Sequence, residues 1–219
     1  MVPLTLIGLE ALQTWRRTKG TAWLGAYKWP VLCFVAVGFW NTVGAGLLGF
    51  SINPPAALYY VQGLNMTAAH GHAALFGVYG MLGIGLMLFC LRGLYDRGLH
   101  LDRVLAPAYW GLNGGLAMMV FLSLLPAGIY QAWASVAKGL WYARSPEIIH
   151  SHLMETLVWM RVPGDIVFAG GAALLAWYAL NLLRVRPHGR LRSLPPEGAG
   201  RFETGEAGSL PPLDLSRKG

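Results

Sequence analysis

Long apolar runs separated by short polar stretches occupy the chain from its start to about residue 185. Four of these runs hold about 20 residues each, the length that a helix needs to cross about 30 Å of hydrocarbon. Apart from histidines, their only side chain that is charged at neutral pH is Asp165, at the edge of the fourth run. The pattern predicts an all-α integral membrane fold with transmembrane helices at Trp29–Phe50, Ala68–Leu91, Ala106–Ile129 and Gly164–Leu183.

A fifth apolar stretch, Leu4–Trp15, is too short to span alone, since a helix over Met1–Trp15 reaches only about 22 Å. It has two interpretations. One is the last half of a spanning helix whose beginning is missing, and the other is a short helix that lies in the membrane interface. The pattern by itself leaves both open.

The polar segments predict different roles. Tyr130–Pro163 is long for a connection, and loops of such length are usually functional or disordered. Because it carries aromatic side chains such as Trp141 and Trp159, we expect it to pack at the membrane interface. The Pro- and Gly-rich segment 186–219 has little to bury, which predicts a disordered cytoplasmic tail after a transmembrane part at 1–185.

Composition and charge support a membrane protein. Hydrophobic residues make up 55% of the chain and charged residues 12%, against about 25% charged in a typical soluble domain. The net charge of +7 reflects topology and not nucleic-acid binding, because the basic residues lie between and after apolar runs and form no aromatic-basic face. With the N-terminal segment cytoplasmic, all of the 17 Lys and Arg residues except Lys138, Arg144 and Arg161 are cytoplasmic. We therefore expect a multi-pass membrane protein, in contact with lipid, with both ends on the cytoplasmic side.

Two histidines, His70 and His72, open the second run, on the periplasmic side in this orientation. Ionisable side chains are costly there and usually functional. A helix turns by about 100° per residue, so the two imidazoles face nearly opposite flanks. They cannot easily chelate one metal, but each could ligate a different centre, and haem iron is commonly held by axial histidine. The alternatives are simple hydrogen bonding for the histidines and helix packing for the nearby Gly77, Gly80 and Gly83.

Four stretches are specific enough to compare with known families: "VPLTLIGLEALQTW", "YKWPVLCFVAVGFWNTVGAGLLGFSINPPAALYYVQGLN", "HGHAALFGVYGMLGIGLMLFCLRGL" and "WMRVPGD". They closely resemble the C-terminal part of the catalytic subunit of quinol-dependent nitric oxide reductases, in the haem–copper oxidase superfamily. The resemblance covers 1–185 and implies a fragment of the subunit I helix bundle. The complete enzyme would convert two nitric oxide molecules, two electrons and two protons into nitrous oxide and water, with quinol as electron donor.

The resemblance also implies roles for single residues. In that superfamily one helix carries a His-x-His, whose first histidine ligates the high-spin haem and whose second ligates the low-spin haem. Carried over, His70 holds the iron of haem b3 and His72 the iron of haem b. The family pairs arginines on its outer surface with haem propionates, and Arg161 occupies a matching place. Asp165 is expected to cap the N-terminus of the fourth helix. No residue is assigned a catalytic role.

Other parts of the family's machinery have no counterpart in the sequence. The family holds a non-haem iron with histidines and a glutamate of earlier helices, and it takes the second ligand of the low-spin haem from an early helix. His150 and His152 are expected to be solvated loop residues and not this second ligand. His100 and His188 fall on the cytoplasmic side.

The chain starts, at Met1, inside what the resemblance marks as a spanning helix. We therefore expect a missing N-terminal part of the subunit as a partner, and an inactive chain in isolation, as a split gene product or a truncated sequence. Two other functions stay open. One is a b-type cytochrome that carries electrons, with a second histidine from another chain, and the other is a haem-free membrane fragment without function.

Overall fold

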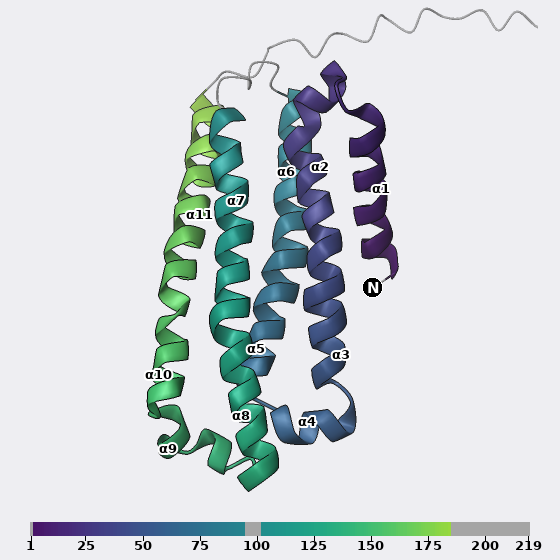
Figure 1. The fold of residues 1–219 in the computed structure, drawn as a ribbon. Coiled ribbons are helices and arrows are strands. Elements are labelled where there is room, and N and C mark those ends of the chain that lie inside the picture. Colours follow the sequence, from purple (N-terminus) through teal and green to yellow (C-terminus); the bar gives the residue numbers. More distant parts are fainter. Residues whose placement is uncertain (1, 95–101, 185–219) are drawn as a thin grey trace, which may run out of the picture. The chain divides into compact units, whose positions relative to one another are not determined.

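The computed structural model describes residues 2–94 and 102–184, which are helical and contain no strand. Four stretches in these ranges are long and apolar enough to cross a membrane, and they cover Ala22–Ile52, Asn65–Arg92, Arg103–Lys138 and His152–Leu182. Their path through the bundle can be followed in Figure 1. The expected class, an all-α membrane protein with four transmembrane helices, is confirmed. The predicted tail at 186–219, and the end of the transmembrane part at 185, lie outside the described residues.

Most spans are composite, because a π-helical segment interrupts three of them. The first span consists of α2 (Ala22–Trp40), η1 (Asn41–Leu48) and α3 (Gly49–Ile52), and the second of α5 (Asn65–Gly71), η2 (His72–Gly80) and α6 (Met81–Leu94). The third consists of α7 (Asp102–Met118), η3 (Met119–Leu124) and α8 (Leu125–Lys138), and the fourth of α10 (His152–Trp159) and α11 (Arg161–Arg184). The remaining helices are α1 (Val2–Thr18), α4 (Pro55–Val61), η4 (Tyr142–Arg144) and α9 (Pro146–Ile149). Such π-helical segments are rare and frequently occur at functional sites.

The spans extend beyond the apolar runs because capping groups, and not hydropathy, decide where a helix begins and ends. The first span begins after Thr21, whose hydroxyl accepts a hydrogen bond from the Leu24 N–H at 3.3 Å. The fourth begins after Ser151, whose hydroxyl accepts from the Met154 N–H at 3.4 Å. Most of the predicted connection 130–163 is therefore helical, comprising the end of α8 with η4, α9 and α10.

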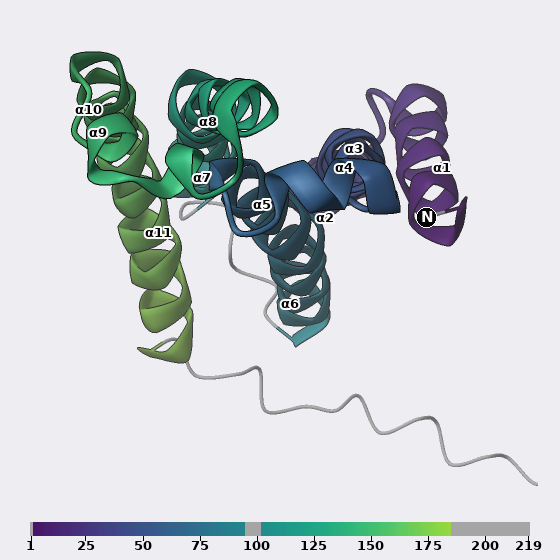
Figure 2. The same ribbon diagram turned by 90° about the horizontal axis from the view of Figure 1, so that it is seen from below.

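Helix α1 runs along the first span instead of lying across it, and Figures 1 and 2 agree on this placement. The two helices are in backbone contact, since a Cβ atom on Gly8 would lie 2.5 Å from the Gly38 Cα. Further along, the Asn41 amide donates to the Thr5 hydroxyl at 2.8 Å. This path along the outer side of the first span argues against a helix that lies flat in the membrane interface.

The main hydrophobic core lies where the first three spans meet, around Trp40, which is 1% exposed. Its indole lies against Gly77, where a Cβ atom would come 2.5 Å from the Trp40 Cγ. The indole N–H donates to the Asn113 side-chain oxygen at 3.0 Å, so its polar group is satisfied inside the core. Gly77 is therefore a helix-packing glycine, as one of the alternatives for the glycine run predicted.

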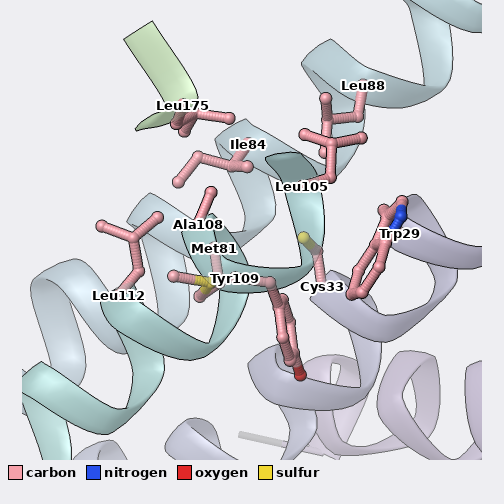
Figure 3. A pocket seen from close by; sticks show the side chains of 10 residues that line it. All are labelled: Trp29, Cys33, Met81, Ile84, Leu88, Leu105, Ala108, Tyr109, Leu112 and Leu175. Atoms are coloured by element: carbon pink, nitrogen blue, oxygen red, sulfur yellow. The ribbon is translucent and has the colours of Figure 1, made fainter. Parts of the chain in front are cut away.

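A second core cluster lies between α2, α6, α7 and α11, and Figure 3 shows the side chains around its small cavity. The cavity measures only about 10 Å³, and every lining side chain is apolar or weakly polar, including Cys33 and Met81. A space of this size and polarity holds at most one water molecule. This small cavity is thus part of the packed core and not a ligand site.

The start of the helix that carries the two histidines is held by a buried glutamine. Gln131 on α8 is 7% exposed. Its side-chain oxygen accepts from the Asn65 N–H at 2.9 Å, and its amide donates to the Ala143 carbonyl at 3.3 Å. One side chain thus joins the first residue of α5 to η4 and α8.

Replacing Gln131 by Leu keeps the side-chain volume but leaves the Asn65 N–H and the Ala143 carbonyl without this partner. We expect the free energy of unfolding to fall by about 1–3 kcal/mol, measured by denaturant titration in detergent. The control is Gln13→Leu, at an exposed position of α1, which should change stability by less than about 0.5 kcal/mol. Equal losses for the two variants would contradict this role.

Candidate functional site

His70 lies on α5, and its half-buried ring is turned toward the first span. The ring Nδ1 is 2.9 Å from the Gly44 carbonyl oxygen, which belongs to η1. The ring edge also lies against Gly49, where a Cβ atom would come within 2.9 Å of the His70 Cε1. The absence of a side chain at Gly49 therefore makes room for this imidazole.

His72 is the first residue of η2, and its half-buried ring is turned the other way, toward the fourth span. Its Nδ1 is 2.8 Å from the Ala68 carbonyl oxygen, one turn earlier in the same helix. Its Nε2 is 3.4 Å from Nη2 of Arg161, the first residue of α11. Figure 2 shows α11 and α3 on opposite sides of α5, so the two imidazoles address different flanks, as the helical rotation predicts.

The hydrogen-bond partners determine which nitrogen of each imidazole carries the proton. A carbonyl oxygen can only accept, so Nδ1 of His70 and Nδ1 of His72 must both be protonated. In the neutral ring the lone pair then resides on Nε2. Metal-ligating histidines have this arrangement, with the other ring N–H donated to a carbonyl or carboxylate. Both rings are thus prepared to offer Nε2 to a metal.

Arg161 is held by an acid on its own helix. Its Nε donates to the Asp165 Oδ1 at 3.2 Å, with the two residues one turn apart. The expectation that Asp165 caps the fourth helix is wrong, because α11 starts at Arg161 and the span starts at His152. The apolar run began at residue 164, but the helix continues outward through α10, so Asp165 is an interior helical residue.

The remaining histidines do not join the site. His150 and His152 are exposed, and the His150 Nδ1 lies 3.9 Å from the Glu155 carboxylate. Both lie on the surface, as expected, but His152 is the first residue of α10 and not a loop residue. His100 and His188 lie outside the described residues. Within residues 2–94 and 102–184, no three His, Cys, Asp or Glu side chains come together as a metal site could require. Ligands for a non-haem iron are therefore not found in the part of the chain that the structure describes.

An apolar groove of about 510 Å³ lies between η2, α6, α7 and α11 and begins one turn beyond His72, which is not among its lining residues. Phe76, one turn after His72, lines it together with Gly80 and Gly83, and Ala172 and Ala176 of α11 line the other wall. A Cβ atom on Gly83 would meet no atom within 4 Å, so this glycine faces open space. Larger apolar side chains such as Met87 and Leu175 complete the lining, so the groove could take an apolar ligand.

Sequence reasoning missed two backbone features of the site. The Gly44 carbonyl and the space at Gly49 belong to the first span, and no side-chain signal marks them among 29 glycines. The pairing of Arg161 with Asp165 did leave a signal, since an i, i+4 pair of opposite charge faces one side of a helix. The capping interpretation overlooked it because the helix was expected to begin later.

The sequence matches the family model of cytochrome c and quinol oxidase polypeptide I over residues 1–167, which include both histidines, Arg161 and Asp165. A nitric oxide reductase chain from Stutzerimonas stutzeri is 32% identical over 95 residues, which cover 42% of this chain. The match covers 20% of that relative, so it spans about a fifth of the relative's length. Since the family match extends over most of the chain, this protein belongs to the cytochrome c and quinol oxidase polypeptide I family, the subunit I family of the haem–copper oxidases.

Proposed function

We propose that this chain supplies the haem-ligating histidine helix of a membrane nitric oxide reductase, in which His70 holds the iron of high-spin haem b3 and His72 the iron of low-spin haem b. The observation that carries the proposal is the pair of imidazoles on α5 and η2. They point to opposite flanks, and each donates Nδ1–H to a carbonyl. The family match and the name of the S. stutzeri relative support a respiratory oxidoreductase of this class.

The residues present fit axial ligation of haem iron at both histidines. Neutral imidazole with a free Nε2 lone pair is the usual axial ligand of haem iron. On the His70 side, Gly49 gives the imidazole room against the first span, and the Gly44 carbonyl accepts from its Nδ1. On the His72 side, the groove that begins one turn further along is apolar and is lined by both small and large side chains, which suits the body of a porphyrin. Arg161, beside His72, supplies a guanidinium suited to a carboxylate such as a propionate.

The chain's own contribution is to orient the two imidazoles and to keep the two haems on separate sides of one helix. When bound, haem supplies one-electron chemistry and a binding position for a diatomic gas. The Gly44 and Ala68 carbonyls hold the two imidazole planes. The main chain from His72 through Gly71 to His70 forms a short covalent connection between the two ligands. Catalysis by these two residues is not part of the proposal, since each binds a cofactor.

The partners of this function follow from the reaction and not from the described residues. Nitric oxide is the substrate, quinol the electron donor, and lipid the surroundings. The non-haem iron and the second axial ligand of haem b would come from a preceding N-terminal part of the protein. We place the protein in the bacterial inner membrane, with the two histidines toward the periplasm, because of the Lys and Arg distribution.

Replacing each histidine by Ala should remove one haem and spare the other. In the assembled protein purified from its native membrane, His70→Ala should lose the high-spin optical signal and His72→Ala the low-spin signal. The control, His152→Ala, changes an exposed histidine and should keep both. If both signals survive both replacements, the assignment is wrong. A low-spin signal without nitric oxide turnover in the unmodified protein would favour the b-type cytochrome alternative.

Adding one methyl group at Gly49 should disturb only the high-spin haem. Its Cβ would lie 2.9 Å from the His70 Cε1, so the ring has to shift. Displacing an axial ligand's support typically lowers metal affinity by about 10–100-fold, and haem titration of Gly49→Ala should show a loss in this range for haem b3. Gly25→Ala, where a Cβ meets no atom within 4 Å, is the matched control. Unchanged binding in Gly49→Ala would contradict the position given to His70.

The proton positions can be measured without haem. In haem-free protein with ¹⁵N-labelled histidine, we expect Nδ1 of His70 and Nδ1 of His72 to carry a proton, because both donate to carbonyls. The exposed His150 serves as a solvated reference, and His70→Asn and His72→Asn variants assign the signals. A ring that carries its proton at Nε2 would contradict the proposed ligand geometry for that histidine.

A further inference from the structure

Arg161 and Asp165 form an ion pair inside a stretch that is long and apolar enough to span a membrane. Their side chains are 37% and 45% exposed, and partly exposed ion pairs one turn apart stabilise a helix only slightly. Ionisable residues in spanning segments are costly and usually have a function. Helix stability alone is therefore a weak reason for Asp165 to be acidic.

The geometry links Asp165 to His72 through Arg161. Nε of Arg161 donates to the Asp165 Oδ1 at 3.2 Å, while Nη2 of the same guanidinium lies 3.4 Å from the His72 Nε2. A guanidinium is a planar, rigid fork, so the bond at Nε also determines where its Nη atoms point. We propose that Asp165 is a positioning residue that holds the Arg161 guanidinium at the Nε2 edge of His72.

The bond to Asp165 matters because water competes for the same guanidinium. Long arginine side chains near the end of a spanning helix extend their charged group to water whenever they can. Arg161 is already more than a third exposed, so water competes directly with His72 for its donors. The Asp165 carboxylate counters this competition because it binds Nε, the guanidinium nitrogen nearest to the main chain.

The inference rests on the proposed function, because its consequence concerns haem b at His72. Iron held at Nε2 would use the lone pair to which Nη2 of Arg161 donates, so this contact would be lost in the haem-bound protein. The bond from Nε to Asp165 involves neither the ring nor the iron, so it can keep the guanidinium beside the ligand. A positive charge there favours the reduced haem by simple Coulomb attraction. Asp165 thus raises the reduced fraction of haem b indirectly, although its own charge acts in the opposite direction.

The direction in which Asp165→Ala changes the ratio of reduced to oxidised haem b distinguishes positioning of Arg161 from a direct effect of the Asp165 charge. Asp165→Ala removes a negative charge, which alone would favour the reduced haem, but it also releases Arg161, which favours the oxidised haem. Redox titration of haem b in the assembled protein from its native membrane should show the second effect. We expect the ratio of reduced to oxidised haem b at a fixed potential to fall about threefold, equivalent to about 30 mV for a one-electron couple. A rise, or no change, would overturn the proposal.

Three further variants make the test specific. Asp165→Glu should restore the ratio, because it retains the carboxylate one turn from Arg161. In an Arg161→Gln background, Asp165→Ala should no longer lower the ratio, since positioning acts only through the arginine. Only the direct effect of the lost negative charge remains there, and it raises the ratio. Glu155→Ala is the matched control, because it removes an acid whose side chain is 57% exposed on the neighbouring α10 and whose partner is His150. If Asp165→Ala lowers the ratio of reduced to oxidised haem b in the Arg161→Gln background as much as it does when Arg161 is present, the proposal is also overturned.

A measurement on haem-free protein keeps this inference separate from the proposed function. The ¹⁵N resonance of His72 Nε2 should move in Asp165→Ala as it does in Arg161→Gln, and it should stay in place in Glu155→Ala. If it stays in place in Asp165→Ala, positioning is refuted whatever haem b does. If His72→Ala retains the low-spin haem, the proposed function fails, while the resonance still decides the role of Asp165.

Discussion

The hydrogen bond from each imidazole Nδ1 to a backbone carbonyl is the interaction on which the account of this site depends. It fixes the plane of the ring, and it places the lone pair on Nε2. The helical rotation between His70 and His72 then sends the two lone pairs to opposite flanks. In the proposed function, one helix serves two metal centres, and the carbonyl behind each ring is what holds its Nε2 in position for this.

The surrounding fold makes these bonds possible through close packing at glycines. The first and second spans approach so closely that a Cβ atom on Gly44 would lie 2.6 Å from the Cβ of Ala73, and this approach brings the Gly44 carbonyl within reach of His70. At the other end of α5, Gln131 holds its first residue. Lipid is as apolar as the side chains, so helices in membranes associate through close packing at small residues and not through the hydrophobic effect. The same glycine contacts therefore pack the helices and place the Gly44 carbonyl beside His70.

Much of the fold, but less of the site, could be predicted from the sequence. Runs of apolar residues identified all four spans, and the spacing of His70 and His72 predicted their opposite directions. The bounds of the spans were less accessible, because caps such as Ser151 extend helices past the apolar run. For the same reason Asp165 was misread as a cap. The π-helical segments and the Gly44 carbonyl arise from tertiary packing, which no local pattern encodes.

The central claim is that one helix presents two imidazoles to two separate haems, and a cryo-electron microscopy map of the protein purified from its native membrane tests it most directly. The account predicts planar haem density on both flanks of α5 and η2, with one iron at the His70 Nε2 and the other at the His72 Nε2. A map with both imidazoles on one flank, or with iron at neither Nε2, would contradict it.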